Sequence, residues 1–173
     1  SDWSSDVCSS DLTRPDLIAE IHRRYLEVGV DTIETNTFGA NLANLAEYGI
    51  TDRIYELALA GAKIARASAD EYGARWVLGS VGPGTKLPTL GHISYRELRD
   101  SYRETARGLI DGGADALLIE TTQDLLQAKA AVNAARMEIE VAPRDIVLIA
   151  QITVETTGTM LLGSEVEIGR AHV

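Results

Sequence analysis

The sequence predicts an α/β fold in which helices join parallel strands, and three observations lead to this prediction. Helix-like and strand-like patterns alternate along the chain, which is the order that right-handed helical crossovers between parallel strands produce. The strands are continuous apolar runs, as expected when both faces of each strand are covered. No strand is followed by a glycine-rich dinucleotide-binding turn. This favours a (β/α)8 barrel over the alternative, an open doubly wound sheet.

Four segments have the pattern of buried strands. Residues 75–82, 115–121 and 145–154 each contain a short run rich in Ile, Val or Leu, and residues 31–36 form a shorter segment around Ile33. The glycine- and proline-rich segment 82–92 is expected to be a loop. It resembles a phosphate-binding loop only in part, because it lacks the adjoining Gly-Lys pair and no helix is expected to start there. The four runs therefore predict four strands, with an irregular connection after the second.

The segments between the strands have helical periodicity. Apolar residues recur every three or four positions, and glycine ends most of the runs. In the last but one helix Ser94 is placed as the N-cap, with Glu97 three residues later, which is the spacing of a capping box. The predicted helices span residues 13–29, 40–49, 52–73, 94–113 and 124–139.

Composition excludes several classes of protein. The chain has 173 residues, of which 45% are hydrophobic and 24% charged, as in ordinary globular proteins. Its formal net charge of −10 argues against a nucleic-acid partner, because phosphate binding depends on clustered Lys and Arg. No apolar run approaches the roughly 20 residues of a membrane helix. The single cysteine, Cys8, excludes a disulfide framework within the chain, and we infer a cytoplasmic location from it.

The two ends of the chain do not have the pattern of a folded domain. The first stretch, SDWSSDVCSSDL, has no helix or strand period and lacks the basic start and apolar core of a signal peptide. One short DNA word, read on opposite strands, encodes both DVCSSDL and the final IGRAHV, and this word resembles a sequencing-library adapter. We therefore predict non-native tails at residues 1–12 and 167–173, around a partial barrel domain at residues 13–166. On this interpretation Cys8 and His172 take no part in the chemistry, and the native polypeptide continues in both directions.

Two of the predicted strands end on a carboxylate. Glu34 follows Thr32–Ile33, and Glu120 follows a longer apolar run. In a (β/α)8 barrel the carboxyl ends of the strands form the active-site face, where an acid can stay ionised and receive a cationic ligand. From the pattern alone a second role stays open, in which these acids pair with arginine or cap the next helix. Other polar residues at predicted strand ends are Asn36, Thr37, Ser80, Gln151 and Thr153.

Taken together, the segments IETNTFGAN, GSVGP, GGADALLIETTQDLLQAKAAV and IAQITVETTGTMLLG resemble the homocysteine S-methyltransferase family. The likeness is greatest to the homocysteine-binding module at the N-terminus of cobalamin-dependent methionine synthase, and it covers about residues 14–165. The resemblance implies a (β/α)8 barrel that binds homocysteine and transfers a methyl group to its sulfur to give methionine. It further implies zinc, held by three cysteines, that binds the homocysteine thiolate, and methylcobalamin as the donor in the synthase.

The resemblance also assigns roles to residues. It implies that Glu120 binds the ammonium group of homocysteine, with Asn36, Thr37 and Thr121 lining the same mouth of the barrel. Ser80 and Gln151 are candidates by position only. No catalytic residue and no metal ligand is assigned within this chain.

Part of the family pattern has no counterpart in this sequence. The family's first strand would lie upstream and its zinc cysteines downstream, which leaves about four of eight strands. His22 is expected on the surface of a helix and His92 in a loop, without partners at metal-binding spacing. We therefore predict an inactive fragment of a methyltransferase whose cobalamin and folate modules lie elsewhere in the parent protein. The partners expected are homocysteine and those modules, with no nucleic acid and no membrane.

Two rival interpretations remain. The first is another barrel enzyme, acting on a phosphorylated or carbonyl substrate, which would need a lysine or metal-binding carboxylates at strand ends. Lys63, Lys86 and Lys129 are all predicted on helices or in a loop. The second is a non-catalytic half-barrel that acts only through self-association, because unpaired strand edges and apolar faces favour association.

Overall fold

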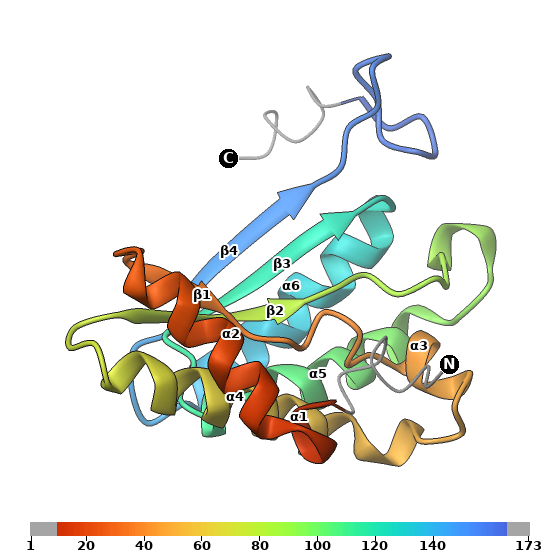
Figure 1. Ribbon diagram of the computed structural model, residues 1–173. Helices are drawn as coiled ribbons and strands as arrows, with labels where there is room; N and C mark the ends of the chain where they lie inside the picture. Colours follow the sequence, from red (N-terminus) through yellow and green to blue (C-terminus); the bar gives the residue numbers. More distant parts are fainter. Residues whose placement is uncertain (1–9, 166–173) are drawn as a thin grey trace, which may run out of the picture.

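The computed structural model describes residues 10–165 and contains one parallel sheet of four strands (Figure 1). The strands are β1 (Thr32–Glu34), β2 (Trp76–Val81), β3 (Ala116–Thr122) and β4 (Val147–Ile152), and they lie side by side in chain order. All three pairings are parallel. Each predicted strand is confirmed, and the order β1-β2-β3-β4 is that of successive right-handed crossovers in a partial (β/α)8 barrel.

Helices connect the strands and cover one face of the sheet (Figure 1). The longer ones agree with the predicted segments to within two residues at most ends. The predicted helix 40–49 contracts to five residues, and a helix before residue 13 was not predicted. The helices are α1 (Ser10–Thr13), α2 (Pro15–Glu27), α3 (Leu42–Ala46), α4 (Ile54–Asp70), α5 (Tyr95–Asp111) and α6 (Leu125–Glu140), with 3-10 turns η2 (Thr51–Arg53) and η3 (Pro88–Leu90).

Side chains at the helix starts explain where two of these helices begin. The Ser94 hydroxyl accepts a hydrogen bond from the backbone N–H of Glu97 at 3.1 Å, so the predicted N-cap of α5 is confirmed. Asp124 caps α6 by accepting from the N–H groups of Leu126 and Gln127 at 2.8 and 3.3 Å. No helix among residues 10–165 is long and apolar enough to cross a membrane.

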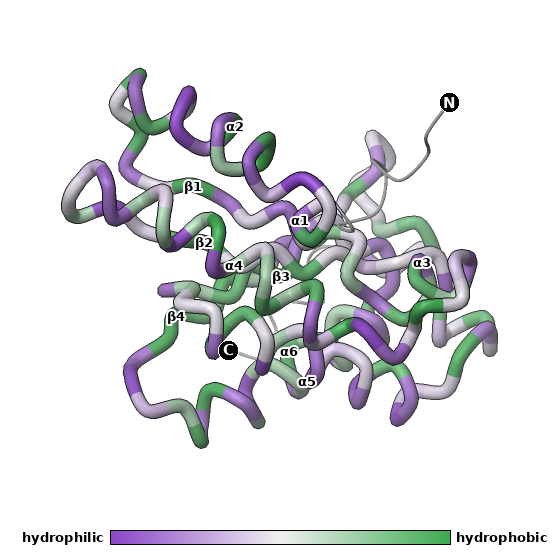
Figure 2. Tube along the Cα trace, turned by 60° about the horizontal axis from the view of Figure 1, so that its bottom comes forward, coloured by the Kyte–Doolittle hydropathy of each residue, from purple (hydrophilic) through white to green (hydrophobic). Residues whose placement is uncertain are grey.

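The core lies between the sheet and the helices. Val77, Val81, Leu117 and Ile119 point to this side and are almost fully buried against alanine-rich faces of α4 and α6 and the apolar face of α5. On α5, Gly108 lets the helix approach α4 closely, because a Cβ there would lie 2.6 Å from the Tyr55 carbonyl oxygen. The strands β2 and β3 and the helices beside them contain hydrophobic stretches (Figure 2).

The opposite face of the sheet would be the interior of a closed barrel. Among residues 10–165 no helix covers it, and its side chains are correspondingly open: Trp76 is 59% exposed and Val147 61%. In this partial barrel, solvent therefore reaches the inner face of the sheet, which a closed barrel would enclose.

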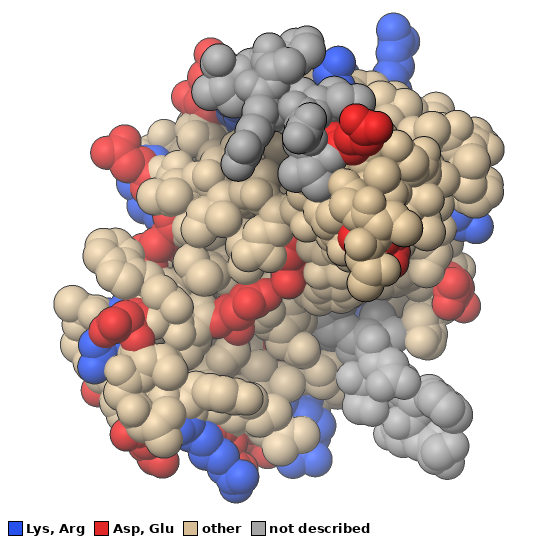
Figure 3. Space-filling model, turned by 90° about the horizontal axis from the view of Figure 1, so that it is seen from above, with Lys and Arg blue, Asp and Glu red and all other residues tan. Residues whose placement is uncertain are grey.

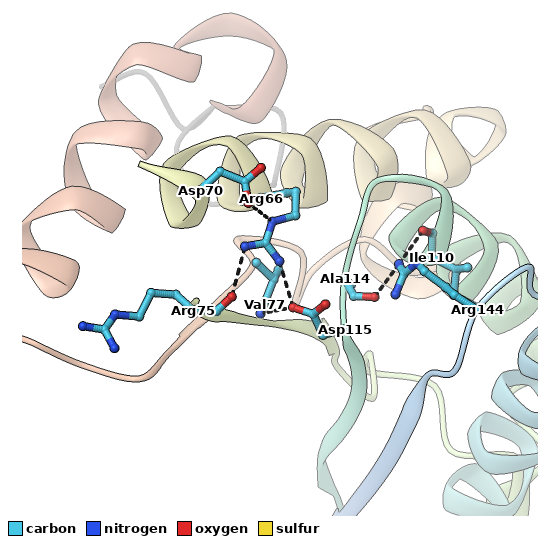
Figure 4. A network of polar contacts seen from close by, with 8 residues as sticks. All are labelled: Arg66, Asp70, Arg75, Val77, Ile110, Ala114, Asp115 and Arg144. Atoms are coloured by element: carbon cyan, nitrogen blue, oxygen red, sulfur yellow. Dashed lines mark hydrogen bonds and ion pairs between the residues drawn. The ribbon is translucent and has the colours of Figure 1, made fainter. Parts of the chain in front are cut away.

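A polar network closes the amino-terminal end of the sheet (Figure 4). The Asp115 carboxylate accepts from the Arg66 guanidinium at 2.9 Å and from the backbone N–H of Val77 at 2.8 Å. Arg66 also donates to the Arg75 carbonyl at 3.0 Å, and Arg144 donates to the carbonyls of Ile110 and Ala114. These bonds satisfy backbone N–H and carbonyl groups and tie α4, β2 and β3 together. They lie at the amino-terminal end of the strands, opposite to the end that carries Glu34 and Glu120.

The short helix α1 lies against the barrel and includes residues predicted to be a non-native tail. Asp11 is 3% exposed and accepts a hydrogen bond from Asn36 at 3.3 Å, while Leu12 packs on the small cluster around Leu45 and Leu57. Burial raises the pKa of the Asp11 carboxyl to about 7. Residues 1–9 and 166–173, which include Cys8 and His172, lie outside the described residues.

The buried Asp11 predicts an unusual dependence of stability on pH. A carboxyl whose pKa is raised on folding contributes stability that is fully present below its unfolded pKa, 3.8, and is lost as the pH rises through about 7. Asp11→Asn is therefore expected to increase the free energy of unfolding by about 1–3 kcal/mol at pH 8, and by less at pH 5. Urea denaturation at both pH values measures this, with exposed Asp52→Asn as the control. An equal effect of Asp11→Asn at both pH values would show that α1 is not docked in solution.

Candidate functional site

The carboxyl ends of β2 and β3 bring Ser80 and Glu120 together on the uncovered face of the sheet. Strand register places Ser80 beside Leu118, so Glu120 projects from the same face two residues further along β3. The buried Ser80 hydroxyl donates a hydrogen bond to the Glu120 Oε1 atom at 2.5 Å. This bond fixes the carboxylate while leaving Glu120 partly open to solvent.

Glu34, at the end of β1, is the second acid of this site. Partial burial and the neighbouring Glu120 carboxylate raise the pKa of Glu34 to about 7, while the Ser80 hydroxyl opposes the shift. Below that pH the Glu34 carboxyl is protonated, and above it Glu34 carries a negative charge beside Glu120. The pair therefore becomes more favourable for a bound cation as the pH rises through neutrality. The sequence predicts Glu34 as a strand-end acid but does not place it among the substrate contacts.

The end of β3 is irregular directly after Glu120. The β3–β4 register shifts between Ile119 and Thr122, and Thr121 has a φ of 58°. A positive φ in a β-branched residue is rare and costs about 1–3 kcal/mol, and such conformations concentrate at functional sites. The bulge changes the direction of the chain at the point where the carboxylate is presented. Thr121, a predicted site residue, is exposed at this bulge.

A chain of hydroxyl groups locks β1 to β2 below the acids. The Thr35 and Thr37 hydroxyls lie 2.7 Å apart, the Thr37 hydroxyl donates to the Ser80 carbonyl at 2.7 Å, and the Ser80 N–H donates to the Thr35 hydroxyl at 2.9 Å. Thr37 is 0% exposed. Its side chain is therefore placed to hold Ser80 in position and not to meet a ligand directly.

The remaining two predicted residues lie at the borders of this region. The Asn36 side-chain amide donates to Ser10 Oγ at 3.1 Å and to Asp11 Oδ2, so α1 engages it. Gln151 is exposed on β4, and its backbone carbonyl accepts from the Thr122 hydroxyl at 2.6 Å. The structure thus brings Glu120, Ser80 and Thr37 together, sets Thr121 beside them, and leaves Asn36 and Gln151 at opposite sides.

The long loop after β2 is held down by residues that the sequence pattern did not identify. Asp124, 0% exposed, accepts from the Thr89 N–H and hydroxyl at 2.9 and 2.7 Å. Buried Gln127 and Tyr102 both donate to the Pro83 carbonyl, at 2.7 and 2.8 Å. These bonds fix the loop above the strand ends. The only sequence signal for them was the Asp at the start of the predicted helix 124–139.

The two histidines of the described region lie far from a metal-binding arrangement. The expectation that His22 is a surface residue is wrong: it is 6% exposed, because it lies on the face of α2 turned toward β1. Burial lowers the pKa of its imidazole. His92 lies in the loop, as predicted, where its Nδ1 faces the Leu87 N–H at 3.4 Å. Residues 10–165 contain no group of three His, Cys, Asp or Glu side chains that could hold a metal ion.

Seen from the side of the sheet that the helices leave uncovered, acidic side chains lie near the middle of the face, with uncharged surface around them (Figure 3). None of the ion pairs formed among residues 10–165 involves Glu34 or Glu120. The cap of α6 is Asp124 and not Glu120. The arrangement is therefore an uncompensated negative site at the mouth of a partial barrel, able to bind a small cation such as an ammonium group.

Known proteins of similar sequence include two methionine synthases. The sequence is 60% identical over 158 residues to methionine synthase of Mycobacterium tuberculosis, covering 89% of this chain and 13% of the relative. It is 58% identical over 165 residues to methionine synthase of Mycobacterium leprae, covering 93% of this chain and 14% of the relative. The chain thus spans about one seventh of the length of these relatives.

Solved structures support the fold. The oxidised form of the homocysteine methyltransferase MmuM from Escherichia coli superposes with a TM-score of 0.76 at 22% identity, over 98% of this chain and 60% of that one. The metallated form gives a TM-score of 0.77 at 23% identity, over 98% of this chain and 61% of that one. The profile described as homocysteine S-methyltransferase matches residues 1–171. The chain therefore belongs to the homocysteine S-methyltransferase family.

Proposed function

We propose that this chain provides the site for the amino-acid end of homocysteine in a methyltransferase of the methionine synthase type. The Glu120 carboxylate, fixed by Ser80 and free of any arginine partner among residues 10–165, is the observation that carries the proposal. Its role is to accept hydrogen bonds from the substrate ammonium group, with Thr121 beside it and Gln151 at the border of the site on β4. Asn36 and Thr37 act indirectly, because their hydrogen bonds fix the chain at the end of β1.

The physical argument rests on charge and position. An ammonium group leaving water needs a charged acceptor nearby, and a hydrogen bond to a charged group contributes about 1.5–3 kcal/mol. Glu120 lies at the carboxyl end of a barrel strand, where substrates of such barrels bind. The nearby Glu34 carboxyl adds a second negative charge above about pH 7. The arrangement therefore selects an α-amino acid over the corresponding acid without an amino group.

The described residues do not fit a zinc site, since they include no cysteine and no converging set of ligands. We propose that zinc and the methylcobalamin and folate modules belong to other parts of the parent protein. The residues of this chain would then bind and orient homocysteine and take no part in activating its thiol. The chain alone is expected to be inactive.

The rival barrel enzyme finds little support in the geometry. Lys63 lies on α4, Lys129 on α6, and Lys86 in the loop after β2, so none of these lysines belongs to a described strand. A carbonyl or phosphate substrate would also meet two acids there, Glu34 and Glu120, neither of which has an ion-pair partner among residues 10–165.

A ligand comparison tests the proposal. In the complete barrel domain, homocysteine is expected to bind about 10–150-fold more tightly than the analogue that lacks its amino group, because only the former reaches Glu120 with a charged donor. Isothermal titration at pH 8 measures both affinities. Equal affinities for the two ligands would contradict the assignment of an ammonium site.

A further inference from the structure

The main chain of Ser80 faces the end of β1, where that strand stops. The Thr35 N–H donates to the Leu78 carbonyl at 2.9 Å, so Leu78 turns its peptide groups toward β1. Alternation turns the N–H and carbonyl of Ser80, two residues further along β2, to the same side. The paired residues of β1 end at Glu34, opposite Leu78. Ser80 therefore needs partners other than the main chain of a regular neighbouring strand.

The hydroxyls of Thr35 and Thr37 supply these partners in a closed ring of hydrogen bonds. The Ser80 N–H donates to the Thr35 hydroxyl at 2.9 Å, and the Thr37 hydroxyl donates to the Ser80 carbonyl at 2.7 Å. The two hydroxyls lie 2.7 Å apart. Because the single hydroxyl proton of Thr37 is used on Ser80, Thr35 is the donor between the two threonines. The direction of each bond in the ring is thereby determined.

Packing holds the ring in this one arrangement. Thr35, Thr37 and Ser80 are 5%, 0% and 1% exposed. Gly61 of α4 leaves room for the Thr37 methyl group, because a Cβ at Gly61 would lie 2.5 Å from Thr37 Cγ2. The methyl and hydroxyl groups of threonine share one rotatable bond, so the position of the methyl group fixes the direction of the hydroxyl.

The ring can act on the candidate site through the side chain of Ser80. With its N–H and carbonyl both bound, Ser80 presents its hydroxyl from a fixed main chain, and this hydroxyl donates to Glu120 Oε1 at 2.5 Å. A binding group that is already held in place loses less freedom when its ligand arrives, so it binds more tightly. The affinity of Glu120 for a cation therefore depends on how firmly Ser80 is held.

We propose that Thr35 and Thr37 are positioning residues for the amino-group selectivity of the site, because their ring with Ser80 fixes the hydroxyl that holds Glu120 toward the substrate ammonium group. This inference rests on the proposed role of Glu120 in binding homocysteine. Neither threonine touches the substrate. Loss of the ring lowers the affinity for homocysteine and leaves unchanged the affinity for the analogue without an amino group, whereas a purely structural role would alter stability and not the ratio of the two affinities.

Substitutions of Thr35 that keep either its shape or its hydroxyl test the ring. Thr35→Val keeps the shape and removes the hydroxyl that joins the Ser80 N–H to Thr37. In the parent protein, this variant is expected to lower the ratio of the affinities for homocysteine and for the analogue about 2–10-fold, the range for loss of one hydrogen bond. Thr35→Ser keeps the hydroxyl and is expected to retain the native ratio. Isothermal titration at pH 8 measures both affinities, and urea denaturation checks that each variant is folded.

A second background shows whether the ring acts through Ser80. Ser80→Ala removes the hydroxyl that reaches Glu120 and leaves the main-chain bonds of the ring in place. In this background Thr35→Val is expected to change the ratio less than about twofold, because the two substitutions interrupt the same connection. An equal reduction in both backgrounds would overturn the proposal.

A steric change reaches the ring without removing a polar group, and it also serves if Thr35→Val does not fold. Gly61→Ala places a Cβ against the Thr37 methyl group and is expected to lower the ratio. Adding Thr37→Ser removes that methyl group and keeps the hydroxyl, so the double variant is expected to regain the native ratio. Failure of Thr37→Ser to restore the ratio would contradict a role for the Thr37 hydroxyl.

The same titrations separate this inference from the proposed function. A native protein that binds homocysteine and the analogue equally would contradict the ammonium site at Glu120, and the positioning role would fall with it. Native selectivity that persists in folded Thr35→Val would overturn the positioning role alone and leave the ammonium site standing.

Discussion

Glu120→Gln is expected to weaken homocysteine binding to the complete barrel domain by about 1.5–3 kcal/mol, or roughly 10–150-fold. Glutamine keeps the Oε1 acceptor that receives the Ser80 hydroxyl, so the local hydrogen bond and the fold are retained. Only the negative charge that meets the substrate ammonium group is lost. Isothermal titration measures the affinity, and thermal unfolding is expected to show little change.

A glutamate-to-glutamine substitution far from the site provides the control for the loss of charge. Glu155→Gln, in the exposed segment after β4, removes the same charge from the chain as a whole and is expected to leave the affinity unchanged. The analogue without an amino group is expected to bind native and Glu120→Gln domains equally. A variant that loses several degrees of melting temperature but binds homocysteine normally would show that Glu120 is a structural residue.

Asp115→Ala is expected to lower the free energy of unfolding by about 2–4 kcal/mol, the largest effect on stability among the polar residues considered. The substitution leaves the Arg66 guanidinium and the Val77 N–H without their shared acceptor, and Val77 is fully buried. Urea denaturation at one fixed chain concentration measures the change, since self-association would couple stability to concentration.

Asp115→Asn provides the matched control for this effect. Its amide oxygen can still accept from the Val77 N–H, so only the ion pair with Arg66 is removed. The expected loss is therefore about half that of alanine or less, because both partners of the pair are partly exposed. Equal losses for the two variants would assign the stability to the ion pair instead of the buried N–H. Neither should alter ligand affinity, since Asp115 precedes β3 at the end opposite to Glu120.

The pattern of the sequence was sufficient for the strands and the longer helices and for the position of Glu120 at the end of β3. Apolar runs at residues 75–82 and 115–121 form β2 and β3, which pair with a strand on either edge and bury Val77, Val81, Leu117 and Ile119 under the helices. The start of α5 followed from Ser94 and Glu97, which act locally. The position of Glu120 at a strand end follows from the alignment of strand ends at one edge of a parallel sheet. Its assignment to the substrate ammonium group rests on the family resemblance and stays a prediction.

Residues whose role depends on distant partners were missed or misplaced. His22 has basic neighbours in sequence, yet it is buried because α2 turns that face toward β1. Asp11 and Leu12 have no periodic context, and they pack only because residues far along the chain, Asn36 and Leu57 among them, form their surroundings. The roles of Gln127 and Tyr102 in holding the loop at Pro83 likewise join positions about 20–45 residues apart.

The sequence by itself therefore determined the alternation of strands and helices, the parallel sheet, and the acid at the end of β3, because each of these follows from local periodicity and from the alignment of strand ends. Only the tertiary structure decided that Glu34 shares its environment with Glu120, that Thr37 supports Ser80 from a fully buried position, and that His22 is buried on the face of α2 turned toward β1. The physical reason is that pKa values, burial and hydrogen-bond partners are set by whichever groups fold alongside a residue, and sequence spacing does not specify those groups.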